Sequence, residues 1–151
     1  MKMAVVRLLC ILNSMLSLHY EDTPVLDLSL DFLEPWLVKV CDSFGNSLDD
    51  LNIIFCSDEY LLEMNRSHLN HDYYTDIITF DYCVETNISG DLFISVDRVL
   101  DNADDLSLSF ELELKRVIVH GVLHLNGLKD KSDEDAADMR SAENEMLALL
   151  N

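Results

Sequence analysis

The chain has 151 residues, about half of them hydrophobic, which argues against a disordered tail and allows one domain with a buried core. Its 29 acidic and 10 basic side chains give a formal charge of −19, which argues against broad coating of nucleic acid, because phosphates are bound by lysine and arginine. We therefore expect an acidic cytoplasmic protein with no DNA partner, in which any contact with RNA is local.

The first residues of the chain form an apolar stretch, 3–18, that must be compared with a signal peptide. Arginine, asparagine and serine interrupt the stretch, and no small-residue cleavage site follows it. It is also too short and too polar to span a membrane. We expect residues 1–14 to be an extra N-terminal segment, with the true start at Met15, and residues 15–151 to form one domain with no membrane partner.

The first predicted elements are a strand over residues 16–20 and a helix over residues 29–44. The helix has apolar residues at helical spacing and should stop at Gly45, a residue common after helix ends. Pro35 predicts either a kink or a helix that begins near Glu34.

The middle of the chain alternates strands and one helix. Residues 51–57 form a β-branched apolar run, which predicts a strand, and a helix follows it as far as residue 69. Residues 75–82 and 90–96 predict two more strands, joined by a turn over residues 87–90.

The last third is predicted to be mainly helical. We expect the acidic run at residues 101–105 to be a solvated loop and residues 106–126 to form a long, central, buried helix that ends at Gly127. Ser132 should cap a final helix that runs to about residue 149. The order of elements predicts an α+β domain with one small mixed β-sheet of about four strands covered by helices.

The strongest chemical signal is a pair of histidines in the long helix. His120 and His124 are four residues apart, so they lie on one face and can bind one ion. Gly127 can reverse the chain and bring Asp130 to the same ion. Two nitrogens and one carboxylate oxygen, with a fourth position open to water, is the pattern of a catalytic Zn²⁺ site, one ion per chain.

Less specific interpretations of these residues stay open. Two histidines four apart occur on many helices that bind no metal, and Lys129 and Lys131 flank Asp130, where they could pair with it on the surface. Five of the ten basic residues gather around the motif, namely Lys115, Arg116, Lys129, Lys131 and Arg140.

Three blocks of sequence together resemble the YbeY family. They are "HDYYTDIITFDY" at residues 71–82, "SGDLFIS" at residues 89–95, and "RVIVHGVLHLNGLKDK" at residues 116–131. The last block is specific, because its His-Gly separates the family from zinc proteases. The resemblance implies a zincin-like metal-binding helix and a single-strand-specific, zinc-dependent endoribonuclease. It further implies late-stage maturation of small-subunit ribosomal RNA and ribosome quality control, with ribosomal RNA, the small ribosomal subunit and ribosome-associated proteins as partners.

The chain departs from the family pattern at two positions. Asp130 stands where the family usually has its third metal ligand, a histidine, and a carboxylate is an acceptable zinc ligand. Leu69 stands where the family usually has an arginine. Arg66, one helical turn earlier, is a candidate replacement, and His68 and His71 are further candidates for contacts with the substrate.

The sequence does not assign a catalytic base. Gly121 stands where a zinc protease has its glutamate, and we expect the small residue to leave room beside the metal for a bulky substrate. A metal-bound hydroxide or the 2′-OH of the RNA could each attack the phosphorus. The alternatives are a metalloprotease-like hydrolase and a non-catalytic ribosome-assembly factor whose metal is structural. Iron, nickel or manganese could replace zinc.

Overall fold

The computed structural model describes residues 14–151. The expected extra segment at residues 1–14, apart from Ser14, therefore lies outside the described residues. Among the described helices, none is long and apolar enough to cross a membrane. The first described contacts anchor the start of the domain, because the backbone N–H groups of Met15 and Leu16 donate to Glu34 Oε1 at 2.7 Å and 3.0 Å.

The sheet has four strands in the order β1-β2-β4-β3. β1 (Leu16–Tyr20), β2 (Ser47–Cys56) and β4 (Asn87–Ser95) are mutually parallel, and β3 (Ile77–Asp81) pairs antiparallel with β4 at one edge. The mixed four-stranded sheet and the α+β class predicted from the sequence are confirmed. Alternation along the strands sends neighbouring residues to opposite faces, so the two faces have separate apolar clusters.

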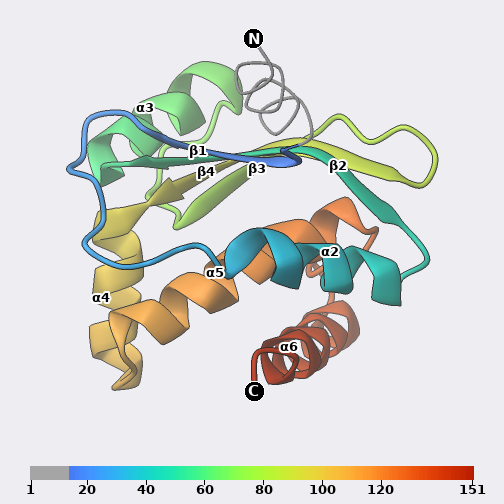
Figure 1. Ribbon diagram of the computed structural model, residues 1–151. Coiled ribbons are helices and arrows are strands. Elements are labelled where there is room, and N and C mark those ends of the chain that lie inside the picture. Colours follow the sequence, from blue (N-terminus) through green and yellow to red (C-terminus); the bar gives the residue numbers. More distant parts are fainter. Residues whose placement is uncertain (1–13) are drawn as a thin grey trace, which may run out of the picture.

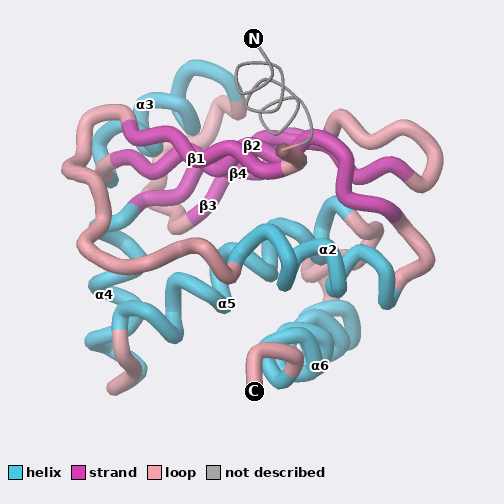
Figure 2. The backbone as a smooth tube through the Cα atoms, in the orientation of Figure 1, coloured by secondary structure: helices cyan, strands magenta, loops and turns pink. Residues whose placement is uncertain are grey.

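Five helices in the described part of the chain cover the sheet unequally (Figures 1 and 2). α2 (Leu33–Ser43) and α5 (Phe110–Leu125) pack on one face, and α6 (Asp133–Ala148) packs on α5, further from the sheet. α3 (Asp58–His68) lies on the opposite face, and α4 (Val96–Leu106) lies beside α5 at one end. The larger core lies between the sheet and the layer of α2 and α5, which makes α5 the central, mostly buried helix.

The prediction of a loop at residues 101–105 was wrong, because this acidic run is part of α4. Val99 and Ala103, four residues apart, are buried against the rest of the domain while the acidic residues face outward. The Ser95 side chain accepts a hydrogen bond from Arg98 N and caps the helix, and Ser107 ends it in a left-handed conformation. α5 consequently begins at Phe110 rather than at residue 106.

Smaller differences concern the ends of elements. α2 begins at Leu33, so Pro35 lies in the first turn, where its missing N–H costs no hydrogen bond. β2 begins at Ser47, before the predicted position. The residues predicted as a turn, 87–90, are the first residues of β4, and the chain turns just before them, where Glu85 has a positive φ.

Candidate metal centre

His120 and His124 lie in the last two turns of α5, where their imidazole rings are edge to face. Nε2 of His120 and Nε2 of His124 are 3.1 Å apart, and the ring centroids are 4.6 Å apart. Both residues are half-buried. The four-residue spacing therefore places two nitrogens at one point on the helix surface, as predicted.

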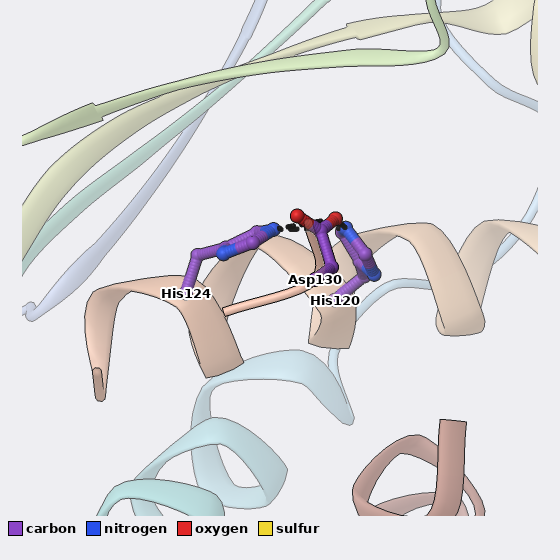
Figure 3. A group of neighbouring side chains, drawn as sticks. All are labelled: His120, His124 and Asp130. Atoms are coloured by element: carbon purple, nitrogen blue, oxygen red, sulfur yellow. Dashed lines mark hydrogen bonds and ion pairs between the residues drawn. The ribbon is translucent and has the colours of Figure 1, made fainter. Parts of the chain in front are cut away.

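The chain reverses after α5 and brings a carboxylate to the same point. Gly127 has a φ of +102°, a conformation that residues with a side chain rarely adopt. Asp130 Oδ2 then lies 3.1 Å from His124 Nε2 and 3.3 Å from His120 Nε2 (Figure 3). Asp130 lies against the two histidines, and in the described part of the chain it pairs with neither Lys129 nor Lys131, so the structure does not show the alternative of a surface pair with lysine.

The three facing atoms have the spacing that one metal ion requires. For metal–ligand bonds of about 2.0–2.1 Å in a tetrahedral arrangement, the ligand atoms lie roughly 3.3 Å from one another. The observed separations are 3.1 Å, 3.1 Å and 3.3 Å, so a divalent ion fits with small movements and one position left open. Among the described residues, His120, His124 and Asp130 form the one group of histidine, cysteine and acidic side chains with such convergence.

Each histidine is oriented by a hydrogen bond on its other nitrogen. His120 Nδ1 lies 2.8 Å from Glu143 Oε2, and His124 Nδ1 lies 2.9 Å from the carbonyl oxygen of Leu128. Since carboxylate and carbonyl oxygens only accept, both Nδ1 atoms donate. When the rings are neutral, their unprotonated Nε2 atoms therefore face the point where a metal ion would lie, which is the usual arrangement of metal-binding histidines.

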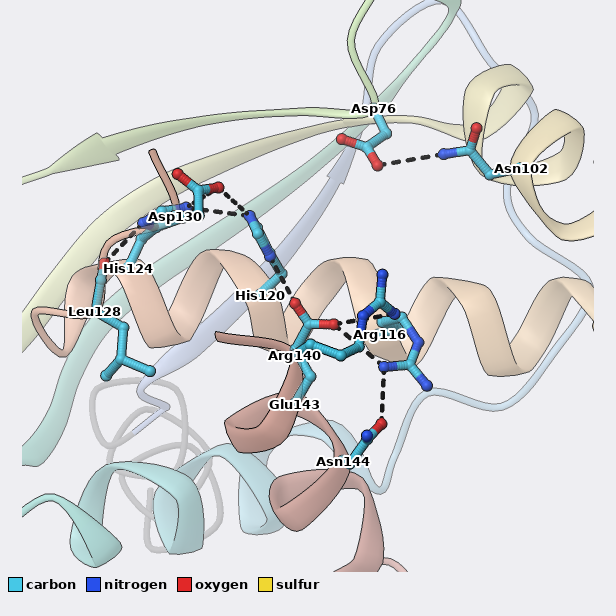
Figure 4. Close-up of polar contacts among 10 residues, drawn as sticks. All are labelled: Asp76, Asn102, Arg116, His120, His124, Leu128, Asp130, Arg140, Glu143 and Asn144. Atoms are coloured by element: carbon cyan, nitrogen blue, oxygen red, sulfur yellow. Dashed lines mark hydrogen bonds and ion pairs between the residues drawn. The ribbon is translucent and has the colours of Figure 1, made fainter. Parts of the chain in front are cut away.

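Glu143, on α6, is the buried centre of a charged network (Figure 4). It is 4% exposed, and its Oε1 lies 3.2 Å from Arg116 Nη1 and 3.5 Å from Arg140 Nη1. Burial alone would raise the pKa of Glu143, but hydrogen bonds from His120 and Arg116 hold that pKa below its usual value. Burial, the largest single influence, would lower the pKa of His120, but the hydrogen bond to Glu143 and the negative charges of Glu143, Asp130 and Asp76 together outweigh it and raise that pKa.

Two cavities meet at the candidate metal-binding residues. The larger, of about 660 Å³, lies along β3 and is lined by β3, His71, Leu69 and Lys131, and we call it the β3 cavity. The smaller, of about 300 Å³, lies between α5 and α6, and we call it the α5–α6 cavity. Asp76, just before β3, borders both cavities together with His120 and Asp130. His120, Asp130 and Asp76 are therefore shared by the two cavities, which lie on either side of them.

The other residues predicted to contact substrate lie in different surroundings. Arg66 forms an exposed ion pair with Asp72 at 2.6 Å and lines neither of the two cavities. His68 is exposed at the end of α3 and also lines neither cavity. His71 does line the β3 cavity, where its ring stacks on Tyr73. Leu69, at the position where the family usually has an arginine, lines the same cavity.

Gly121 plays a different part from the one expected. A Cβ atom added there would lie 2.7 Å from Ile77 Cδ1 and 2.9 Å from Leu92 Cδ2. Gly121 therefore faces the sheet, and those side chains fill the space that its hydrogen leaves. The expected room beside the metal does not arise from this residue, which instead lets α5 approach β3 and β4 closely.

The sequence predicted no role for Glu143 beside the two histidines and Asp130. Glu143 lies on α6 and Arg116 on α5, and the two residues are in contact only because α6 packs on α5. Asp76 is half-buried, burial raises its pKa, and Asn102 donates to it at 3.3 Å. The one local signal was Arg116 itself, four residues before His120 on the same face of the helix.

Comparison with known proteins identifies the family. The family model described as "Endoribonuclease YbeY" matches residues 25–151. The chain belongs to the YbeY family. The resemblance predicted from the three sequence blocks is thereby confirmed.

Individual relatives agree over most of the chain. A protein named Endoribonuclease YbeY from Porphyromonas gingivalis is 53% identical over 76% of this chain and 76% of its own length. One of the same name from Flavobacterium johnsoniae is 51% identical over 91% of this chain and 98% of its own. A solution structure of a Thermotoga maritima protein superimposes with a TM-score of 0.60 and 25% identity, covering 89% of this chain and 91% of that one.

Proposed function

We propose that this member of the YbeY family is a single-strand-specific, metal-dependent endoribonuclease, with Zn²⁺ held by His120, His124 and Asp130. We further propose that it acts in the cytoplasm, in late-stage maturation of small-subunit ribosomal RNA and in ribosome quality control. The observation that carries the proposal is the convergence of three ligand atoms within 3.3 Å of one another where two cavities meet. The family's endoribonuclease name supports RNA as the substrate.

The three side chains suit catalysis better than a purely structural ion. Structural zinc sites in proteins are usually closed by four protein ligands, whereas catalytic sites keep one position open. Here three ligands converge, and their exposed side faces a cavity of about 660 Å³. A divalent ion bound there would supply a Lewis acid for the phosphoryl oxygens and a hydroxide near neutral pH.

The protein's own groups hold and orient the reacting parts. Glu143 and the Leu128 carbonyl fix the two imidazole rings, so the ligand geometry exists before substrate arrives. Lys131 lines the β3 cavity and offers a positive charge to the RNA backbone in a chain whose net charge is −19. Arg66 is held by Asp72 away from both cavities, which disfavours it as the replacement for the arginine that Leu69 lacks.

The absence of the protease glutamate favours phosphodiester over peptide cleavage. The side-chain position of Gly121 is filled by the sheet, so α5 provides no carboxylate there to deprotonate a water molecule. RNA carries its own nucleophile, the 2′-OH, and the attack needs no such base. Casein hydrolysis, with and without a chelator, tests the metalloprotease alternative, and we expect none.

The first experiment is to measure the metal content of the purified protein beside Asp130→Ala. About one zinc per chain in the wild type, and a lower content or affinity in the variant, is the result expected from three ligands. Asp133→Ala, an exposed carboxylate at the start of α6, is the matched control and should keep its metal. A wild type that stays metal-free after zinc is supplied would overturn the proposal.

The second experiment is cleavage of single-stranded RNA by His124→Ala. Loss of a direct ligand should reduce cleavage by more than the roughly 100-fold that loss of a supporting residue can cause. Circular dichroism should show the fold unchanged, and His68→Ala, outside both cavities, should cut like the wild type. Equal cutting by His124→Ala would place the activity elsewhere. Zinc binding without any RNA cleavage would favour the non-catalytic assembly factor.

A further inference from the structure

The loop between α3 and β3, residues 69–76, carries two stacked aromatic side chains that line the β3 cavity. The rings of His71 and Tyr73 have centroids 5.1 Å apart and planes inclined by 20°. A hydrogen bond of 3.0 Å joins Tyr73 Oη and His71 Nδ1. The stacking and the hydrogen bond hold the two rings as one unit, which we call the aromatic pair.

The aromatic pair is exposed although the loop that carries it is anchored. Tyr73 is 56% exposed, His71 is also exposed, and neither ring belongs to the two apolar clusters of the described chain. Asn65 on α3 is 2% exposed, and its side chain donates to the Tyr73 carbonyl oxygen at 3.0 Å. The Asn65 carbonyl oxygen accepts from the His71 N–H at 2.9 Å. A ligand can therefore reach aromatic surface whose backbone is already fixed.

The β3 cavity offers few cations to a nucleic-acid strand. Lys131 is the one lysine or arginine among the described residues that line it, and it faces three carboxyl groups, which belong to Asp76, Asp81 and Asp130. Leu69, where the family usually has an arginine, lines the same cavity. Apart from a bound metal ion, little positive charge is available for phosphates, so another interaction has to supply affinity for the strand.

Stacking on a nucleobase is an interaction that needs no opposite charge. Tyrosine and histidine rings are among the side chains on which unpaired RNA bases stack. The β3 cavity, of about 660 Å³, lies within the range of roughly 300–1,000 Å³ that is usual for ligand sites, and it also contains the three candidate metal ligands. A nucleotide therefore fits with its base at the aromatic pair and a phosphate toward the metal ligands.

We propose that His71 and Tyr73 form a stacking platform for one unpaired base of the RNA strand. The base continues the stack of the two rings, and Lys131 contacts a phosphate of the same strand. The inference rests on the proposed function, because it places the scissile phosphate at the metal ligands in the same cavity. In this chain the platform supplies by stacking the affinity that the family's arginine would supply by charge.

The platform gives a physical reason for single-strand specificity without sequence preference. In a duplex each base is already stacked on its neighbours and paired, so it is not free to stack on a side chain. Every base has an aromatic face, so all four bases are accepted, with a modest preference for those that stack most strongly.

Binding of a labelled 2′-O-methyl RNA hexamer to the zinc-loaded full chain, measured by fluorescence anisotropy, tests the platform apart from cleavage. Tyr73→Leu keeps an apolar side chain but loses the aromatic face, so affinity should fall roughly 5- to 100-fold, the usual effect of one lost base stack. Tyr73→Phe keeps the ring and should bind within about twofold of the wild type. Tyr82→Leu, at a residue 58% exposed and outside the cavity lining, is the matched control and should bind like the wild type.

A hexamer of abasic spacers, which keeps the phosphates and lacks the bases, shows whether Tyr73 acts through a base. The wild type should bind this hexamer more weakly than the base-containing one. The ratio of the two affinities should shrink in Tyr73→Leu by the factor that the variant loses. A general loss of structure would lower both affinities together and leave their ratio unchanged. Circular dichroism and metal content should be the same in all variants.

The dependence on salt separates stacking from a phosphate contact. Lys131→Ala should reduce the steepness of log K against log salt concentration by about 0.7, the effect of one lost phosphate contact on a single strand. Tyr73→Leu should lower affinity at every salt concentration and leave the steepness unchanged. A reduced steepness in Tyr73→Leu would assign the residue to phosphate binding and overturn the platform.

The outcomes separate this inference from the proposed function. No binding of the hexamer by the wild type, equal binding by Tyr73→Leu, or an unchanged affinity ratio in that variant overturns the platform even if the same preparation cuts RNA. A ratio that shrinks in Tyr73→Leu and is kept in Tyr73→Phe and Tyr82→Leu supports it. If that preparation binds zinc and cuts no RNA, the nuclease proposal fails and the platform stands as an RNA-binding site.

Discussion

The buried polar side chains in the two halves of α5 differ in whether they have hydrogen-bond partners. In the C-terminal half, the Nδ1 atoms of His120 and His124 both have hydrogen-bond partners, and their Nε2 atoms converge with Asp130 at the spacing that a metal ion would need. In the N-terminal half, Glu113 Oε2 and Arg116 Nε are buried with no partner in the described residues. The C-terminal half is pre-organised, whereas the N-terminal half buries two polar atoms without partners, which costs stability. A substitution that disrupts the C-terminal half should therefore weaken metal binding or stability. A substitution that removes the unpaired charge in the N-terminal half should raise stability.

The largest effect should come from disrupting the C-terminal half at Glu143. Glu143→Gln keeps the volume but removes the charge that orients His120, so zinc affinity should fall by about 10- to 100-fold. Zinc affinity by competition with a chromophoric chelator measures the change. Glu145→Gln, an exposed carboxylate on the same helix, should bind zinc like the wild type. Equal affinity of the two variants would show that the network does not tune the metal.

Gly121→Ala tests the packing beneath the C-terminal half. The added Cβ atom would lie 2.7 Å from Ile77 and 2.9 Å from Leu92, so either the side chains or the helix must move. Over-packing of this kind should lower the free energy of unfolding by about 1–3 kcal/mol, measured by urea denaturation. An unchanged free energy of unfolding would mean that α5 can move away from the sheet without cost.

Glu113→Gln should act in the opposite direction. Burial raises the pKa of Glu113 above its unfolded value, so the ionised carboxyl group destabilises the fold above that pKa and not at pH values where it is protonated in both states. The variant should therefore be more stable than the wild type by about 1 kcal/mol at neutral pH. The gain should vanish as the pH falls through this raised pKa toward 4.5, the ordinary value. A gain that is independent of pH would contradict this cause.

The smallest effect should come from Arg66, outside α5. Its ion pair with Asp72 is exposed and lies away from both cavities, so Arg66→Ala should change RNA cleavage by less than about twofold and stability by less than about 1 kcal/mol. Lys131→Ala, which removes a cation from the β3 cavity, is the informative comparison and should weaken RNA binding more. A larger loss of RNA binding in Arg66→Ala than in Lys131→Ala would support Arg66 as the replacement for the family's arginine.

The sequence predicted what depends on local spacing. The spacing of four from His120 to His124 places them on one helix face, and a glycine after the helix allows the chain to reverse toward Asp130. These features need no knowledge of the rest of the fold. The strands were predicted for a similar reason, because their apolar runs are continuous.

What the sequence did not predict depends on packing between distant elements. Glu143 looked like one acidic residue among many in a chain with 29 of them, and only the packing of α6 on α5 distinguishes it. The helix α4 was missed because its acidic residues dominate the composition while two buried residues, Val99 and Ala103, determine its position. From the sequence we expected Gly121 to leave room for substrate. The residues that fill this space belong to β3 and β4, which are distant from Gly121 in the sequence.

The hydrogen bond from His124 to the Leu128 carbonyl has a consequence for anyone who scans this protein by mutagenesis. The acceptor belongs to the main chain, so a substitution at position 128 leaves it in place. Side-chain mutagenesis therefore does not detect the contribution of this hydrogen bond. Tolerance of many amino acids there would be mistaken for irrelevance. Ester replacement of the peptide link that follows Leu128, by semisynthesis, weakens that oxygen as an acceptor and would expose its share of the metal affinity.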